Sequence, residues 1–133
     1  MLQQSENRIK KIVLIDDEKS FVDLLSYILK KENYEVISFI EPSEVLKNIN
    51  LLKDADLILL DLYMPNIDGF NLLSYIKKEL NFNTPPIIFI TNLKYTEDGQ
   101  LIDDDFAKNL GVNGVIFKTD DYQKNLEKIK FFL

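Results

Sequence analysis

The feature that most constrains this chain is an unbroken apolar run, Leu-Ile-Leu-Leu at residues 57–60, that ends in the carboxylate Asp61. Such a run, in which no polar residue alternates, is typical of a strand buried on both faces of a parallel sheet. Turn-forming pairs follow at 64–65 and 68–69, and a new apolar pattern begins at Phe70. Because ligands of open parallel sheets bind outside the carboxyl ends of the strands, Asp61 is the first candidate for chemistry.

The same alternation of strand and helix runs through the whole chain. Four further segments have the length and composition of strands, at 12–15, 35–39, 87–90 and 115–117. Apolar residues at helical spacing alternate with the strands, at 21–31, 42–52, 70–80, 102–110 and 122–133. The pattern predicts one domain over residues 1–133, an α/β fold with a doubly wound, five-stranded parallel sheet and five helices. Residues 1–8 are polar and predict a flexible N-terminal arm.

The composition limits what the chain can do. Its 133 residues, 46% of them hydrophobic, suffice to bury the core of one domain. The absence of Cys and His excludes disulfides, thiolate metal sites and His-dependent catalysis, and leaves carboxylates as metal ligands. A net charge of −6 argues against direct binding of nucleic acid. No apolar stretch has membrane-spanning length and no secretory signal is evident, so we expect a cytoplasmic location without membrane insertion.

Polar residues stand at the carboxyl ends of four predicted strands: Asp16 and Asp17, Asp61, Thr91, and Lys118. In a parallel sheet these ends share one edge, so the five side chains are expected to line one cleft. Clustered carboxylates repel one another, and a divalent cation relieves the repulsion. Oxygen ligands without His or Cys favour Mg²⁺, with Mn²⁺ as a substitute. Mg²⁺ held in this way usually accompanies a phosphate, and a carboxylate near it can act as the nucleophile.

The ordered set of these residues matches a family. The matching pieces are Asp16-Asp17-Glu18 after the first strand, Asp61 with Met64-Pro65 and Asp68-Gly69 after the third, Thr91 and Lys118. Over residues 11–133 the chain resembles the receiver domain of bacterial response regulators in two-component systems. The resemblance implies the flavodoxin-like (β/α)5 fold of the chemotaxis regulators, with strand order 2-1-3-4-5. Taken singly, each piece also fits a solvated loop, a helix cap or a surface group.

The resemblance also implies a metal site. Asp17 and Asp61 would bind Mg²⁺ directly, Asp16 would act through a water molecule, and Tyr63 would contribute its backbone carbonyl. Asp61 would be the phosphoacceptor, phosphorylated by a sensor histidine kinase, a phosphotransfer protein or a small acyl phosphate. The domain would catalyse its own phosphorylation and slow dephosphorylation without being an enzyme in the usual sense.

Two further residues have implied roles in signalling. Lys118 would pair with the phosphoryl oxygens, and Thr91 would turn toward them in the activated state. The implied partners are the kinase or phosphotransfer protein and a downstream protein target, with a phosphorylation-linked dimer as a further possibility. The start at Met1 and the end at Leu133 favour a stand-alone receiver that acts through such a partner.

The sequence departs from the family pattern at three places. The aromatic switch residue of receivers is replaced by Val115, and the nearby Phe117 is expected to face the same way as Val115. At the position after the conserved Lys, where receivers usually have Pro, this chain has Thr119. We expect a strained cis Lys118–Thr119 bond, which would cost roughly 3–4 kcal/mol, with a rearranged trans loop as the alternative. Residues 92–100 form a polar loop that is longer than is usual in the family.

Three alternatives remain open at this level. A pseudo-receiver would keep the fold as a phosphorylation-independent interaction module, a reading to which Val115 and Thr119 give some weight. A phosphohydrolase of the haloacid-dehalogenase type would need a second Asp two residues after the nucleophile, where this chain has Tyr63. A flavodoxin-like redox module would need a Gly/Ser/Thr-rich phosphate loop after the first strand, where Asp16 and Asp17 would repel a phosphate.

Overall fold

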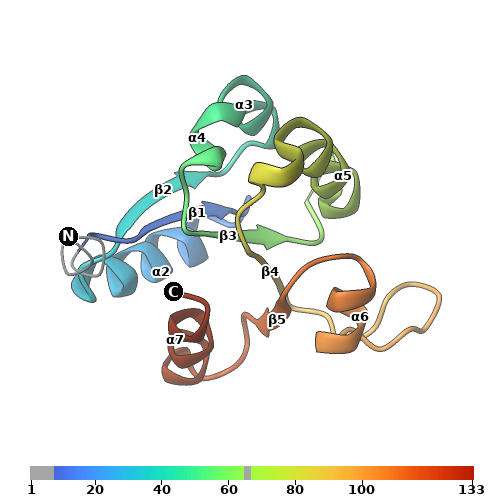
Figure 1. Cartoon of the computed structure of the whole chain (residues 1–133). Coiled ribbons are helices and arrows are strands. Elements are labelled where there is room, and N and C mark those ends of the chain that lie inside the picture. Colours follow the sequence, from blue (N-terminus) through green and yellow to red (C-terminus); the bar gives the residue numbers. More distant parts are fainter. Residues whose placement is uncertain (1–7, 65–66) are drawn as a thin grey trace.

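The computed structural model describes residues 8–64 and 67–133, and its five strands form one parallel sheet with the order β2-β1-β3-β4-β5 (Figure 1). The predicted fold class and strand order are confirmed. The strands are β1 (Lys11–Ile15), β2 (Glu35–Phe39), β3 (Leu57–Asp61), β4 (Ile87–Thr91) and β5 (Gly114–Phe117). The helices are α2 (Lys19–Lys31), α3 (Pro42–Lys47), α4 (Ile49–Lys53), α5 (Gly69–Leu80), α6 (Asp104–Asn109) and α7 (Tyr122–Phe131), with a 3₁₀ turn at Asn81–Asn83.

The described residues thus contain six α-helices, where the sequence predicted five. The difference lies at Asn48, which divides the helix expected over 42–52 into α3 and α4. Asn48 has φ −125° and ψ 31°, outside the helical region, and its side-chain amide donates to the carbonyl of Glu44 at 2.7 Å. Asn favours such local hydrogen bonds over helix continuation, which explains the break.

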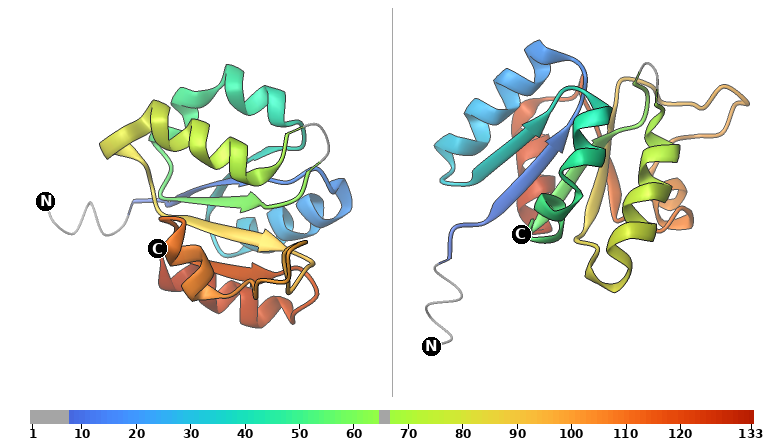
Figure 2. Two further views of the ribbon diagram at one scale, coloured as in Figure 1. Left: turned by 90° about the vertical axis from the view of Figure 1, so that its right-hand side faces the viewer. Right: turned by 90° about the horizontal axis from the view of Figure 1, so that it is seen from above.

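Helices cover both faces of the sheet (Figure 2). The side chains of the strands alternate between the faces, so each strand contributes to two separate cores. On one face Val13, Ile58 and Phe89 pack under α3, α4, α5 and α6, and on the other Leu14 and Leu59 pack under α2 and α7. The central strands β3 and β4 are buried along their whole length, as the unbroken apolar runs predicted.

The N-terminal arm predicted over residues 1–8 lies, except for Arg8, outside the described residues. Arg8 itself is held by two hydrogen bonds to the carboxylate of Asp56, at 2.6 and 3.0 Å. Among the described helices, none is both long and apolar enough to cross a bilayer.

The loop expected over residues 92–100 has local structure. Tyr95 and Leu101 form an antiparallel bridge, and the Ile102 N–H donates to the Lys94 carbonyl at 2.8 Å. The turn closes through Thr96, whose N–H donates to the Gln100 carbonyl at 2.8 Å. We call residues 94–102 the hairpin segment. It extends beyond the body of the domain before α6 begins (Figure 2, right).

Candidate functional site

Three carboxylates meet where β1 and β3 end. Asp16 and Asp17 follow β1, Asp61 is the last residue of β3, and these neighbouring strands are in register with Ile15 opposite Leu60. One carboxylate oxygen from each Asp lies within 4.8 Å of the other two. Asp16 is fully buried and Asp61 is 3% exposed, whereas Asp17 is partly exposed. The sequence prediction that these three residues come together is confirmed as geometry.

The Lys118 ammonium, which follows β5, reaches across the sheet edge into this cluster. Its Nζ lies 2.7 and 2.9 Å from the two carboxylate oxygens of Asp16 and 3.3 Å from Oδ2 of Asp61. Glu18 is more distant, at 3.7 Å. Although burial lowers the pKa of Lys118, the hydrogen bond to Asp16 and the charge of Asp61 outweigh it and leave this pKa raised. Lys118 is therefore a fixed cation next to the candidate nucleophile.

Asp61 is held in an environment that disfavours its charge. Burial and the nearby carboxylate of Asp16 raise the pKa of Asp61 from 3.8 to about 7, against the opposing influence of Lys118. The backbone N–H of Tyr63 donates to Asp61 Oδ1 at 3.2 Å and orients the carboxylate. A further cation in the cluster would favour the ionised form of Asp61, which is the nucleophilic form.

Thr91 ends β4 on the opposite side of Asp61 from Asp16. It is 1% exposed, and its Oγ1 accepts a hydrogen bond from the Leu93 N–H at 3.0 Å. Asp61, Thr91, Leu93 and Lys118 line a cleft of about 400 Å³, together with Asp17, Glu18, Tyr63 and Asn92. All residues predicted for the site therefore gather at one cleft except Asp16, which lies beneath it.

The donor set fits a hard divalent cation. Asp16 Oδ2 is buried and accepts no well-oriented hydrogen bond among the described residues, although Lys118 Nζ is close to it. Three carboxylates carry more negative charge than the one ammonium neutralises. Oxygen-only ligands that leave coordination positions for water and phosphate are typical of Mg²⁺ sites. Asp16, Asp17 and Asp61 are the residues that would hold the ion; the backbone carbonyl of Tyr63 stays a prediction.

A family model described as the response regulator receiver domain matches residues 12–130 of this chain. The chain belongs to this family. Among its relatives, the alkaline phosphatase synthesis transcriptional regulatory protein PhoP of Bacillus subtilis is 35% identical over 114 residues, which are 85% of this chain and 41% of PhoP. The chain thus spans less than half the length of this curated relative.

Solved structures agree with the receiver fold. The chemotaxis protein CheY4 of Vibrio cholerae superposes with a TM-score of 0.78, covering 95% of this chain and 100% of its own, and at 22% identity it supports the fold alone. The response regulator protein TrrA of Thermotoga maritima is 26% identical with a TM-score of 0.75 and covers 94% of this chain and 100% of its own. Its structure was solved in complex with Mg(2+)-BeF.

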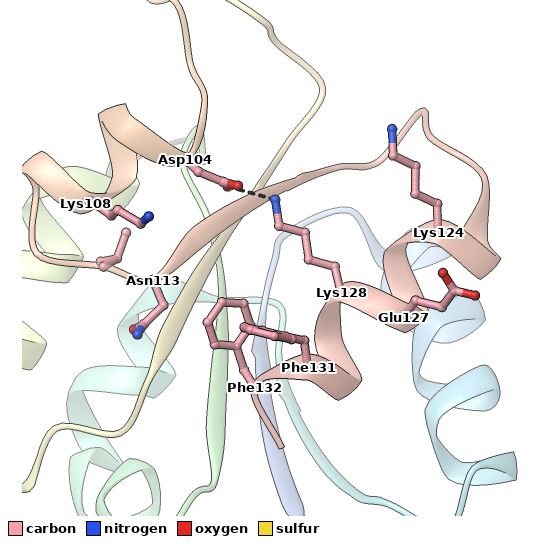
Figure 3. A pocket seen from close by; sticks show the side chains of 9 residues that line it. Asp104, Lys108, Asn113, Lys124, Glu127, Lys128, Phe131 and Phe132 are labelled. Atoms are coloured by element: carbon pink, nitrogen blue, oxygen red, sulfur yellow. Dashed lines mark hydrogen bonds and ion pairs between the residues drawn. The ribbon is translucent and has the colours of Figure 1, made fainter.

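Val115, at the position where the family resemblance implies a switch residue, is buried and held by residues of two helices. Val115 is 2% exposed and lies with Phe117 on the same face of β5, as predicted, while Ile116 faces the other core. The backbone of Val115 is held from both sides: its N–H donates to Asp104 at 3.0 Å, and its carbonyl accepts from Lys128 Nζ at 2.7 Å. Asp104 and Lys128 also pair with each other at 2.7 Å, between α6 and α7 (Figure 3). Phe117 lies opposite Thr91 in the register of β4 and β5.

The cis peptide bond expected at Lys118–Thr119 is wrong, and the alternative, a trans bond, is the one observed. Residues 8–64 and 67–133 contain no cis peptide bond. A peptide bond before Thr, unlike one before Pro, strongly favours the trans isomer, and the loop after Lys118 accommodates the trans bond. The turn is held instead by the N–H of Asp120, which donates to the Phe117 carbonyl at 3.0 Å.

Two residues that position Lys118 were not expected from the sequence. Asn125 of α7 is 7% exposed, and its side-chain amide donates to the Phe117 carbonyl at 2.8 Å. The ring of Phe21 in α2 lies 5.1 Å from the Lys118 ammonium, in a cation–π contact. The available signal for Asn125 was its place as a polar residue among the apolar positions of the last helix. Phe21 gave no signal, because an aromatic residue at helical spacing usually belongs to the hydrophobic core.

Gly69 is the residue at which the loop after Asp61 returns to the sheet. Its N–H donates to the Leu62 carbonyl at 2.8 Å, and an added Cβ would lie 2.3 Å from the Asp61 carbonyl and 2.6 Å from Leu62 Cα. We expect Gly69→Ala to lower the free energy of unfolding by about 2–3 kcal/mol, because two backbone segments must separate. Urea denaturation measures this loss.

The matched control for this substitution is Gly99→Ala in the hairpin segment. Gly99 has φ +88° and no neighbour within 4 Å of an added Cβ, so its replacement tests backbone strain without steric overlap. We expect a loss of about 1 kcal/mol there. Equal losses at the two glycines would contradict the role of Gly69 in close packing.

Proposed function

We propose that this receiver domain is phosphorylated on Asp61 in a Mg²⁺-dependent reaction and acts as a switch in a two-component or phosphorelay system. The observation that carries the proposal is the placement of Lys118 Nζ, 3.3 Å from the Asp61 carboxylate at the rim of an acidic cleft. The resemblance to TrrA supports it, since that relative binds Mg(2+)-BeF. Asp16, Asp17 and Asp61 would hold Mg²⁺, with Mn²⁺ as a substitute.

The chemistry follows from the cleft. One carboxylate oxygen of Asp61 attacks the phosphorus of the donor; an oxygen–phosphorus bond forms, and the bond from phosphorus to the donor's leaving nitrogen or oxygen breaks. Lys118 neutralises charge on the phosphoryl oxygens, and Thr91 can donate its hydroxyl to one of them after its side chain turns. Bound Mg²⁺ supplies charge stabilisation to the transferring phosphoryl group. Water later hydrolyses the acyl phosphate and restores the carboxylate.

The partners and location remain part of the proposal. The phosphoryl donor would be a sensor histidine kinase or a phosphotransfer protein, and the phosphorylated domain would signal through a downstream protein, with a phosphorylation-linked dimer as one route. We propose a cytoplasmic location, in keeping with the family. The pseudo-receiver alternative has no observation in its favour at the site, where no carboxylate, hydroxyl or ammonium of the family pattern is missing.

The proposal is tested by incubation with acetyl phosphate, with and without Mg²⁺, followed by intact-mass measurement. We expect a mass gain of one phosphoryl group in wild-type protein with Mg²⁺ and none in Asp61→Asn. Asp105→Asn, an exposed Asp on α6 with the same change of charge, is the matched control and is expected to be phosphorylated like wild type. Modification of Asp61→Asn would place the phosphoryl group on another residue and contradict the assignment of Asp61. No modification of wild type with any small phosphodonor, and no binding of beryllofluoride, would favour the pseudo-receiver.

A further inference from the structure

A second cavity, of about 560 Å³, lies beside the phosphorylation cleft and shares Tyr63 with it. It opens between the hairpin segment and the residues that begin α5 and form α6. Its lining consists of residues from three parts of the chain: Tyr63, Asp68 and Phe70; Thr96, Glu97, Asp98 and Gln100; Phe106 and Leu110. The hairpin segment supplies four of these residues and so builds one wall of the cavity.

The floor of this cavity is aromatic. The Phe70 ring lies at the centre, with the Tyr63 ring at 6.1 Å and the Phe106 ring at 6.2 Å, both edge-to-face. A third edge-to-face contact, to the buried Phe89 at 6.3 Å, ties Phe70 to the core under the sheet. Three aromatic side chains, tied to one another and to the core by ring contacts, therefore line the cavity.

The rim of the cavity is acidic and lacks a cation. Asp68, Glu97 and Asp98 lie on it, and none of the nine lining residues is basic. Within residues 8–64 and 67–133, no Lys or Arg lies within ion-pair distance of these three carboxylates. The pKa of the Tyr63 phenol is raised, first by burial and then by the negative charges of Glu97, Asp98 and Asp68.

The hairpin segment carries Glu97 and Asp98 on the rim and holds the carboxylate of Asp98 by a hydrogen bond. Glu97 and Asp98 occupy the turn that Thr96 closes, through the Gly99 N–H to its carbonyl at 3.0 Å and the Gln100 N–H to its Oγ1 at 2.9 Å. The Thr96 hydroxyl also donates to Asp98. Glu97 has no such partner among the described contacts and stands at the turn.

We propose that this cavity binds an arginine or lysine side chain presented by a partner protein. A long cationic side chain satisfies both features, because its charge pairs with the rim carboxylates and sits over the negative faces of the aromatic floor. The volume of about 560 Å³ exceeds what a bare metal ion needs and suits a long side chain with its flanking backbone. The receiver would thus recognise its partner through a basic side chain of that partner. This second site is separate from the phosphorylation cleft, but Tyr63 lines both.

The test is an NMR titration of the ¹⁵N-labelled full chain with the peptide acetyl-Ala-Arg-Ala-amide. The same peptide with citrulline in place of arginine is the neutral control. We expect the amide signals of Gln100 and Phe106 to shift with the arginine peptide and not with the citrulline peptide.

The charge variant for this test is Glu97→Gln/Asp98→Asn, which keeps the acceptor for Thr96. It should raise the dissociation constant roughly fivefold or more, since two charges are removed from the rim. The matched variant Asp54→Asn/Glu79→Gln removes two exposed charges elsewhere and should leave the constant unchanged. Equal shifts with the citrulline peptide, or equal weakening in both double variants, would overturn the proposal.

Discussion

Replacement of Lys118 by alanine is expected to lower the free energy of unfolding of the metal-free protein by about 3 kcal/mol at pH 8. The side chain of Lys118 is 7% exposed, and Asp16 and Asp61, its two nearest partners, are 0% and 4% exposed at their side chains. Without the ammonium, two buried carboxylates face each other uncompensated. Urea denaturation in EDTA, followed by circular dichroism, measures the loss.

The dependence of this loss on pH separates electrostatics from packing. The pKa of Asp61 is already about 7 with Lys118 present, and removal of that cation raises it further. Below pH 6 the carboxyl group of Asp61 is neutral in the folded variant, so the deficit relative to wild type should shrink. A loss that stays constant from pH 5 to pH 8 would mean that the alanine acts only by leaving a cavity.

The experiment on Lys118 includes a control variant, Lys19→Ala, and a second measurement with added Mg²⁺. Lys19→Ala removes an exposed ion pair with Asp23, at 70% and 62% side-chain exposure, and should change stability by at most about 0.5 kcal/mol. Added Mg²⁺ should restore more stability to Lys118→Ala than to wild type, since a second source of positive charge matters more once the ammonium is gone. An equal response of both proteins to Mg²⁺ would contradict this account of the cluster.

The sequence predicted most of the site because the site is a property of strand ends. Asp16, Asp61, Thr91 and Lys118 each follow an apolar run, and parallel register brings the ends of such runs to one edge of the sheet. Neither the depth of Asp16 nor the direction of Lys118 follows from this rule. Those depend on side-chain packing, such as the contact of Lys118 with Phe21.

What the sequence did not predict depends on contacts between distant segments. The cavity beside the cleft is lined by Tyr63 and Phe106, which come from distant segments of the chain, and local periodicity contains no such information. The hydrogen bonds of the Val115 backbone in β5 with Asp104 and Lys128 likewise connect α6 and α7, which are distant in the sequence. At Asn48 the apolar spacing is helical, but a hydrogen bond from the Asn48 side chain to the Glu44 carbonyl accompanies a break in the helix. Periodicity alone does not predict such a break.

The converse substitution at the cluster, Asp61→Asn, is expected to raise the free energy of unfolding of the metal-free protein by about 1–3 kcal/mol at pH 8. The folded-state pKa of Asp61, about 7, lies above its ordinary value of 3.8, so the folded protein binds this proton more tightly than the unfolded chain. The resulting stabilisation is complete at pH values below the pKa of Asp61 in the unfolded chain. It is lost as the pH rises through the pKa of Asp61 in the folded protein. Asparagine cannot lose a proton, and Lys118 remains paired with Asp16 in the variant.

The difference in stability between Asp61→Asn and wild type should therefore grow from pH 5 to pH 8, measured by urea denaturation in EDTA. Asp54→Asn, on the exposed end of α4, removes the same charge and should show no such growth. Mg²⁺ provides the opposite test: it should stabilise wild type above pH 7 and act much less on Asp61→Asn, because one of three carboxylates is gone. A variant less stable than wild type at pH 8 in EDTA would show that the ion pair of Asp61 with Lys118 outweighs burial and the repulsion from Asp16.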